Sequence, residues 1–245
     1  MKIGVKTYND EKFLDNFINK ADFFEVQAIQ KYNYDFLKKY KKLEIPFVIH
    51  AEHIAFGINL ADKSIEKENL KSINFAIKLA DMTNAKKIII HPGYISNKYC
   101  SKEQSINFFK KLKDKRILVE NLHSLGNRLC QTPKKTKEFL KKTKRNFIFD
   151  LSHAIAVANT IKLNKEKTIK DFLELNPKHF HLGGQNWDSD NDQHNSFKEV
   201  KLPYKKILAW YPKNAEITLE VTGDIKKTEY DLEFILEDSE DDFDE

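Results

Sequence analysis

Eight short runs of β-branched or aromatic residues recur along this 245-residue chain, and they constrain its fold more than any other feature. Most of them are separated by lysine-rich stretches whose apolar residues have helical spacing. The runs occupy residues 2–5, 23–27, 46–50, 87–91, 117–120, 147–150, 179–182 and 216–220. Strands that alternate with helices form a parallel sheet, and we therefore predict an α/β fold.

The helices expected between the strands carry their own start signals. Ser101 stands three residues before Gln104, the spacing of a capping box, and Thr132 followed by Pro133 indicates an N-cap with proline at the first helical position. We expect Ser64 to cap the longest helix. The apolar stripe of that helix is assigned to the core and comprises Ile65, Ile73, Ala76, Ile77 and Ala80.

Eight strand and helix pairs in 245 residues match the (β/α)8 TIM barrel, for which about 250 residues is typical. The main alternative is a doubly wound open sheet. Such sheets bind nucleotides through glycine-rich loops, yet neither G-x-G-x-x-G nor G-x-x-x-x-G-K-[ST] follows any of the runs, and the chain has seven glycines in all. We predict a single TIM barrel over residues 1–236 and a short, acidic, disordered tail over residues 237–245.

The net charge of +5 conceals a strong asymmetry along the chain. Residues 229–245 hold ten acidic residues and no basic one, so the first 228 residues carry a charge of 42 − 27 = +15. A basic body attracts phosphate. However, Arg116, Arg128 and Arg145 are the only arginines, and lysine lacks the planar group that binds phosphate with two hydrogen bonds. Charge alone therefore does not establish nucleic-acid binding.

Two further observations narrow the class of protein. No run approaches the ~18 apolar residues of a membrane span. The first ten residues also lack the apolar segment of a secretory signal, so we expect a cytoplasmic protein with no membrane partner. Cys100 and Cys130 lie far apart, which argues against a thiolate metal site. A bound metal would therefore need histidine and carboxylate ligands.

Metal-ligand residue types gather where a TIM barrel builds its active site, at the carboxyl ends of its strands. Strands three to eight each end in such a residue or carry one within a residue of their end. Three more follow in the loops. The nine candidates are His50, His91, Glu120, Asp150, His153, His181, Asp192, His194 and Glu220. One cation needs three or four ligands, so nine of them suit a centre of two or three cations.

Each of these residues also has a structural explanation. A histidine at a strand end is often a hydrogen-bonded mouth residue, Asp150 and Asp192 could cap the helices that follow, and Glu120 could pair with a lysine. We assign His123 and His179 to such structural roles. By strand alternation His179 points the same way as His181, and we expect it to support the ligands or to pack in the core. Six successive strands end in residue types that bind metal ions. This succession favours a metal centre formed by the nine candidate residues.

The residues around these candidates resemble the endonuclease IV family, within the xylose isomerase-like TIM barrels, over residues 50–220. The matching segments are HAEHIAFGINLAD from His50, HPG at 91–93, VEN at 119–121, DLSH at 150–153, HLGG from His181, DQH at 192–194 and LEV around Glu220. The resemblance implies a trinuclear centre, commonly of zinc, that cleaves the phosphodiester on the 5′ side of an abasic site in DNA.

Carried over residue by residue, the resemblance makes Glu120 a carboxylate that bridges two cations. The other ligands of the first cation would be His50 and His91, those of the second Asp150, His181 and Glu220, and those of the third His153, Asp192 and His194. His53 is the alternative to His50. Up to three Zn²⁺ ions are implied, with Mn²⁺ or Fe²⁺ as alternatives. The catalytic residues would be Glu120 and Glu220, with Glu220 orienting or deprotonating the water from which an activated hydroxide attacks phosphorus.

The departures from the family lie in the loops that grip its substrate. Residues 6–11 (KTYNDE) replace its glycine-containing loop, Lys31 and Tyr32 stand where an arginine is expected, and residues 195–197 lack its glycines.

We therefore keep a second hypothesis, a single-metal isomerase or epimerase of a small sugar or sugar phosphate, with the metal held by Glu120, Asp150, His181 and Glu220. A barrel that only binds or regulates is a third. If the substrate is a nucleic acid, deleting residues 237–245 should strengthen its binding at low salt.

Overall fold

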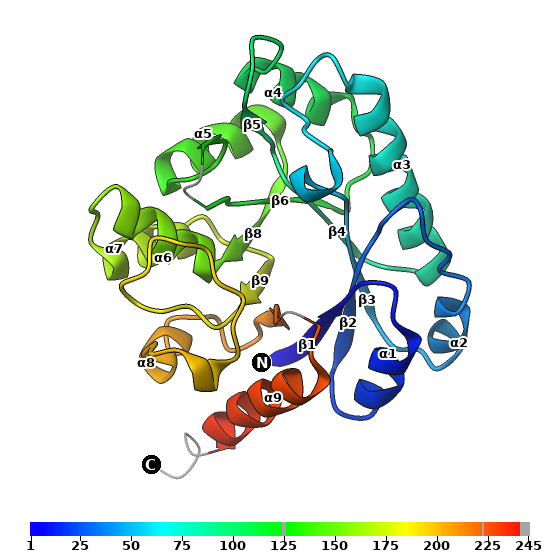
Figure 1. Ribbon diagram of the computed structural model, residues 1–245, viewed down its shortest axis with the longest axis vertical. Helices are drawn as coiled ribbons and strands as arrows, with labels where there is room; N and C mark the ends of the chain where they lie inside the picture. The colour runs from blue at the N-terminus through cyan, green and yellow to red at the C-terminus, as the bar shows by residue number, and fades with distance from the viewer. Residues whose placement is uncertain (124–125, 222, 241–245) are drawn as a thin grey trace.

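The computed structural model describes the chain except for residues 124–125, 222 and 241–245. Within the described part, eight parallel strands close into a barrel in which β10 returns to pair with β1 (Figure 1). The strands are β1 (Lys2–Thr7), β2 (Phe23–Gln27), β3 (Phe47–His50), β4 (Lys87–Ile90), β6 (Ile117–Glu120), β8 (Asn146–Asp150), β9 (His179–Leu182) and β10 (Glu216–Leu219). All eight coincide with the predicted runs, so the TIM barrel is confirmed.

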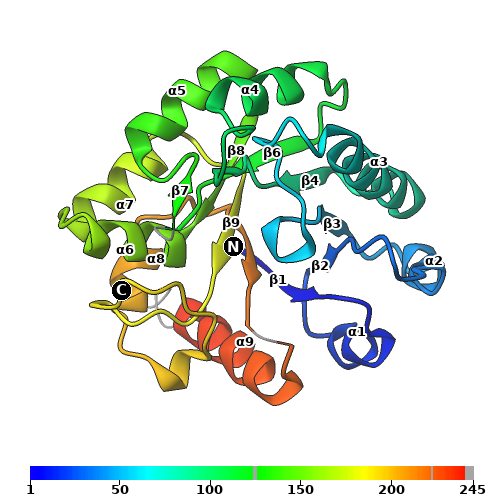
Figure 2. The ribbon, with the colours of Figure 1, turned by 45° about the horizontal axis from the view of Figure 1, so that its top comes forward.

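The helices form a ring around the strands, and Figure 2 shows α9 lying beside α1 where the ring closes. Glu229 of α9 accepts hydrogen bonds there from Asn16 at 3.0 Å and Lys20 at 2.5 Å. The helices are α1 (Glu11–Phe17), α2 (Leu37–Lys42), α3 (Glu66–Thr83), α4 (Lys102–Lys111), α5 (Pro133–Thr143), α6 (Leu151–Thr160), α7 (Lys165–Leu173), α8 (Tyr204–Leu208) and α9 (Ile225–Glu240), with short 3-10 turns η1 (Ile54–Phe56) and η2 (Phe197–Glu199).

The barrel interior has an apolar floor beneath a polar mouth. The floor is a separate buried cluster of one residue from each of five strands: Phe23, Val48, Ile89, Leu118 and Ile148. In a strand every second side chain points to the same face. The residues two positions after the floor are therefore also inward, and they stand at the mouth, the barrel end where the strands' carboxyl ends meet.

Two of the three predicted helix starts are confirmed. The Ser101 hydroxyl accepts a hydrogen bond from Gln104 N at 3.0 Å, and the Thr132 hydroxyl accepts one from Lys135 N at 3.4 Å. The prediction for Ser64 is wrong: α3 starts at Glu66 without a side-chain cap. The N-cap position is occupied by Ile65, one residue after Ser64, and the Ser64 hydroxyl donates to Asp62 Oδ1 at 2.6 Å.

The predicted start of the acidic tail is wrong by one helical turn. Helix α9 continues through Glu240, so residues 237–240 are helical. This segment contains neither glycine nor proline and is rich in glutamate, a good helix former. The rest of the predicted tail, residues 241–245, lies outside the described residues. Over the chain as described, we find no helix with the length and apolar character needed to span a membrane.

Two very short strands were not predicted. Strand β5 (Tyr94–Ile95) follows β4, strand β7 (Asn127–Arg128) follows β6, and they pair in antiparallel fashion above the barrel. Asn59 anchors the same region, because its side-chain oxygen accepts from Tyr94 N at 3.0 Å and its amide donates to Tyr94 O at 3.0 Å. The loops after β3, β4 and β6 are thereby fixed to one another at the mouth.

Candidate metal centre

The first group of donor atoms lies at the ends of β3, β4 and β6. Glu120 Oε2 is 3.2 Å from His50 Nε2 and 3.1 Å from His91 Nε2. His50 Nδ1 lies 2.9 Å from Ala51 O, which assigns the proton to Nδ1 and leaves Nε2 as a donor atom facing Glu120. His53 stacks on His91 with ring centroids 4.6 Å apart, but belongs to no donor group among the described residues. The geometry thus favours His50 over His53.

The second group shares Glu120 with the first. His181 Nδ1 is 3.4 Å from Glu120 Oε1, 3.6 Å from Asp150 Oδ2 and 2.9 Å from Glu220 Oε2. Asp150 has the capping role weighed from the sequence, and its second oxygen stays available for the role of a metal ligand. Its Oδ1 accepts from His153 N at 2.8 Å and so caps α6, which leaves Oδ2 directed toward the group.

The third group centres on Asp192, in the long loop after β9. Asp192 Oδ2 lies 3.3 Å from His153 Nε2 and 3.3 Å from His194 Nε2. His153 Nδ1 is 2.7 Å from Asn121 O, so its Nε2 is the donor atom that faces Asp192. His123, which we had assigned a structural role, lies within 4.8 Å of His153 and Asp192 in the same donor group, whereas His194 approaches Asp192 from outside that group.

Several polar atoms at the mouth are buried without a hydrogen-bond partner among the described residues. They include His181 Nδ1, Glu220 Oε2 and Asp192 Oδ1. Two donors at ~2.0–2.1 Å from a tetrahedral zinc ion lie about 3.3 Å apart. The neighbouring donors here are separated by 2.9 to 3.6 Å. The spacing and the unsatisfied atoms both fit bound cations, as does the mixture of imidazole and carboxylate.

The electrostatics of the mouth also suit a cation. Burial raises the pKa of Glu120, but His91 and His181 outweigh it and hold that pKa well below its usual range. Burial lowers the pKa of His153, but Asp150 and Asp192 outweigh it and raise that pKa to about 10. Glu120 is therefore ionised, and without a cation His153 carries a compensating proton. A metal ion would replace that proton, because a ligating histidine must be neutral.

Two inward-facing residues of β1 and β2 escaped the sequence analysis. Lys6 Nζ is 2.5 Å from Glu220 Oε1 and 3.5 Å from Glu25 Oε1. Burial lowers the pKa of Lys6, but Glu220 and Glu25 outweigh it and raise the pKa above its usual value. Glu25 Oε2 is 2.9 Å from His181 Nε2, so it fixes the tautomer that leaves Nδ1 for the mouth. Neither residue ends its strand, which is why the strand-end pattern missed both.

His179 lies beneath the mouth, as we expected. It is fully buried, with Nε2 2.8 Å from the Thr218 hydroxyl and Nδ1 3.2 Å from Lys87 Nζ. It forms a further group of donor types with Glu25 and His181 inside the barrel. Its side chain contacts Phe23 of the floor with ring centroids 5.4 Å apart. His179 thus connects the floor to the residues that support the mouth.

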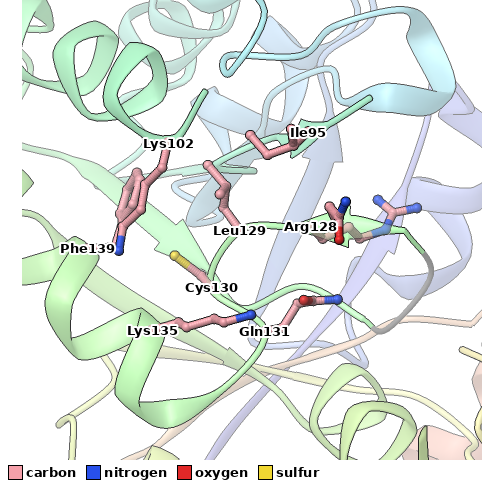
Figure 3. Close-up of a pocket in the computed structure, with 9 residues that line it drawn as sticks. Ile95, Lys102, Arg128, Leu129, Cys130, Gln131, Lys135 and Phe139 are labelled. Carbon is pink, nitrogen blue, oxygen red and sulfur yellow. The ribbon is translucent and has the colours of Figure 1, made fainter. Parts of the chain in front are cut away.

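Seven of the nine candidate ligands, all but Asp150 and His181, line a cavity of about 260 Å³, whose wall also includes Lys6, His53 and Arg128. Arg128 lies on strand β7 and borders a second cavity of about 280 Å³ between β7 and α5. Figure 3 shows its guanidinium group directed away from Cys130, which lines that second cavity. Arg116 and Arg145 do not line the cavity at the mouth. Of the three arginines, Arg128 is therefore the one that lines the cavity at the mouth.

The closed parallel barrel is a TIM barrel, and the imidazoles and carboxylates gathered at its mouth form groups that could hold metal ions. The chain belongs to the xylose isomerase-like TIM barrel family, whose pattern matches residues 18–235. It is 24% identical over 242 residues to an uncharacterized protein of Methanocaldococcus jannaschii, covering 85% of this chain and 90% of the relative.

Two similar solved structures have different activities in their names. A D-tagatose 3-epimerase-like protein superposes with a TM-score of 0.80 at 20% identity, covering 98% of this chain and 97% of the other. Endonuclease IV from Thermus thermophilus superposes with a TM-score of 0.75 at 15% identity, covering 98% of this chain and 100% of the other. At such low sequence identities the structural likeness shows the fold alone. The activity therefore has to be argued from the residues at the mouth of the barrel.

Proposed function

We propose that this protein is a metal-dependent phosphodiester hydrolase that cleaves DNA at abasic sites with a centre of two or three cations. The observation that carries the proposal is the position of Glu120. Its Oε2 faces His50 and His91, while its Oε1 faces His181 at 3.4 Å. Because the two oxygens of one carboxylate belong to two donor groups, Glu120 is suited to bridge two cations.

The proposed ligands are those that the family resemblance implies. His50, His91 and Glu120 would hold one cation, Glu120, Asp150, His181 and Glu220 a second, and His153, Asp192 and His194 a third. When bound, the cations would supply a water of lowered pKa and neutralise charge on the phosphate oxygens. The preferred ion is Zn²⁺, with Mn²⁺ or Fe²⁺ as alternatives.

The residues of the chain itself complete the site. Lys6 holds one oxygen of Glu220, and the other lies 2.9 Å from His181 Nδ1 in the second donor group, where Glu220 would orient the attacking water or accept its proton. Arg128 adds positive charge at the rim, where it would bind a phosphate oxygen.

Incision of a DNA duplex that contains one synthetic abasic site tests the proposal directly. Protein loaded with Zn²⁺ or Mn²⁺ should cut on the 5′ side of the site, and excess chelator should abolish the cut. A duplex of the same sequence without the abasic site is the control. The proposal fails if metal-loaded protein shows no chelator-sensitive cleavage.

A single-metal epimerase or isomerase of a small sugar or sugar phosphate is the second candidate. Two observations favour it: Glu120, Asp150, His181 and Glu220 form a complete four-ligand group on their own, and the cavity of about 260 Å³ is small. It ranks second because it gives no role to His91 or to the group around Asp192. Conversion of aldoses and ketoses followed by NMR, with one bound metal per chain, would establish it.

A further inference from the structure

Three imidazoles converge on one oxygen atom of Asp192. Asp192 Oδ2 is 3.3 Å from His153 Nε2, 3.3 Å from His194 Nε2 and 4.0 Å from His123 Nε2. The other carboxylate oxygen, Oδ1, is buried without a hydrogen-bond partner among the described residues. The family resemblance accounts for His153, Asp192 and His194, and leaves His123 without a role.

His123 stands at the same distance along the chain from its strand end as His153, although His153 lies on α6 and His123 lies in a loop. Each histidine stands three residues after an acidic strand end, His123 after Glu120 of β6 and His153 after Asp150 of β8. Because β6 and β8 are neighbours in the barrel, the two rings come together with centroids 5.2 Å apart. His123 is largely buried, with 13% of its side chain exposed, and lines the cavity at the mouth.

The loop that carries His123 is held from within the chain. The Gln131 side chain donates to His123 O and to Gly126 O, both at 3.2 Å, and β7 pairs with β5 immediately beyond. His123, His153 and Asp192 also form a donor group whose atoms all lie within 4.8 Å of one another. The ring is therefore placed beside Asp192 by the backbone.

We propose that His123 is a fourth protein ligand of the third cation, together with His153, Asp192 and His194. This inference rests on the proposed multinuclear centre. Structural zinc sites have four protein ligands in tetrahedral arrangement, whereas catalytic sites have three and keep an open position. A four-ligand third site is closed, so its cation ties the segments after β6, β8 and β9 together. Substrate contacts then fall to the two cations that share Glu120.

Competition between the full-length zinc-loaded protein and a chelator tests this assignment. The wild type should retain three ions per chain, and His123→Ala should release one of them at a chelator concentration at least about 10-fold lower. His194→Ala should behave in the same way. Ile54→Ala is the matched control, because Ile54 lines the same cavity but has no side-chain atom that can bind a metal ion. It should titrate like the wild type.

Cobalt substitution and one conservative variant give a second readout. The visible spectrum of bound Co²⁺ depends on its ligands, so His123→Ala, which removes an imidazole from the third site, should shift or weaken the bands of that ion. His123→Asp, which keeps a ligand atom, should restore the ion even if the alanine variant folds poorly. Unchanged zinc retention and an unchanged cobalt spectrum in His123→Ala would overturn the inference. Two ions in the wild type would overturn it and leave the hydrolase standing, whereas one ion would contradict both.

Discussion

The side chains of the barrel interior form two layers because of their position along each strand. A floor residue precedes a candidate ligand by two positions in four strands: Val48 and His50, Ile89 and His91, Leu118 and Glu120, Ile148 and Asp150. The alternation of a strand sends both members of each pair inward. Burial of the apolar member stabilises the barrel, and the polar member is left at the mouth.

Glu25 should matter for metal binding although it is not a proposed ligand. Its carboxylate orients His181, and a partner of this kind contributes roughly 10-fold to 100-fold in metal affinity. We expect Glu25→Gln to weaken binding of the ion held by His181 by that factor, measured by zinc titration of the metal-free protein. Glu216→Gln, which removes the partner of Lys87 at the opposite end of the barrel, is the control. Equal affinities for the two variants would contradict this role.

Arg128 should contribute to binding of an anionic substrate. A hydrogen bond to a charged group is worth about 1.5–3 kcal/mol, so Arg128→Met should lower kcat/KM by roughly 10-fold or more, mainly by raising KM. The control is Arg116→Met, because Arg116 pairs with Asp81 and Asp114 away from the cavity. Steady-state kinetics on the abasic duplex provide the measurement. An unchanged KM would remove Arg128 from the site.

Among the elements, the connection from β4 to β5 depends on one glycine. Gly93 has φ +98°, and a Cβ there would lie 2.5 Å from Asn59 Oδ1 and 2.8 Å from Ala61 N. Gly93→Ala should therefore destabilise the protein by more than the ~1–2 kcal/mol of left-handed backbone strain. Gly57→Ala is matched, because Gly57 has φ +79° but nothing within 4 Å of the point where a Cβ would stand. Denaturant unfolding should give the larger loss for Gly93→Ala, and equal losses would contradict the clash.

The contact between α9 and η2 should make stability depend on pH. Asp231 accepts hydrogen bonds from the Ser196 hydroxyl at 2.5 Å and Phe197 N at 2.9 Å, and burial raises its pKa to about 6. A raised folded-state pKa means that the folded protein binds the proton more tightly than the unfolded chain. Stability from this group is complete below the unfolded pKa of about 4 and is lost as pH rises through 6.

Asp231→Asn stays neutral at every pH, so it should not lose this contribution. Its free energy of unfolding relative to the wild type should rise between pH 4 and pH 7, measured by denaturant titration of the metal-free proteins. A difference that stays constant over this range would show that Asp231 does not titrate as described.

Most elements could be predicted from the sequence because their signals are local. The β-branched runs located all eight barrel strands, and the barrel itself brings their ends together. Strands β5 and β7 have two residues each, too few for a period-2 pattern, and their pairing depends on loops that meet only after folding. Lys6 and Glu25 were missed because they lie within their strands, whereas the sequence pattern searched for ligand types at the strand ends.

For the whole molecule, the acidic C-terminal segment should oppose binding of nucleic acid. Since α9 extends to Glu240, the relevant truncation removes residues 241–245, which carry four acidic side chains. The truncated protein should bind DNA more tightly at low salt, and the difference should shrink as salt screens the charges. Fluorescence anisotropy at two salt concentrations provides the measurement. Equal affinity at low salt would show that the segment does not affect binding through its charge.

The central claim is that Glu120 bridges two cations, and the number of metal ions bound per chain tests it most directly. Native mass spectrometry of protein purified without chelator and loaded with Zn²⁺ counts those ions on the intact chain. We predict three ions in the wild type and at least two fewer in Glu120→Ala, because one carboxylate belongs to two donor groups. A wild-type protein that binds a single ion would contradict the claim.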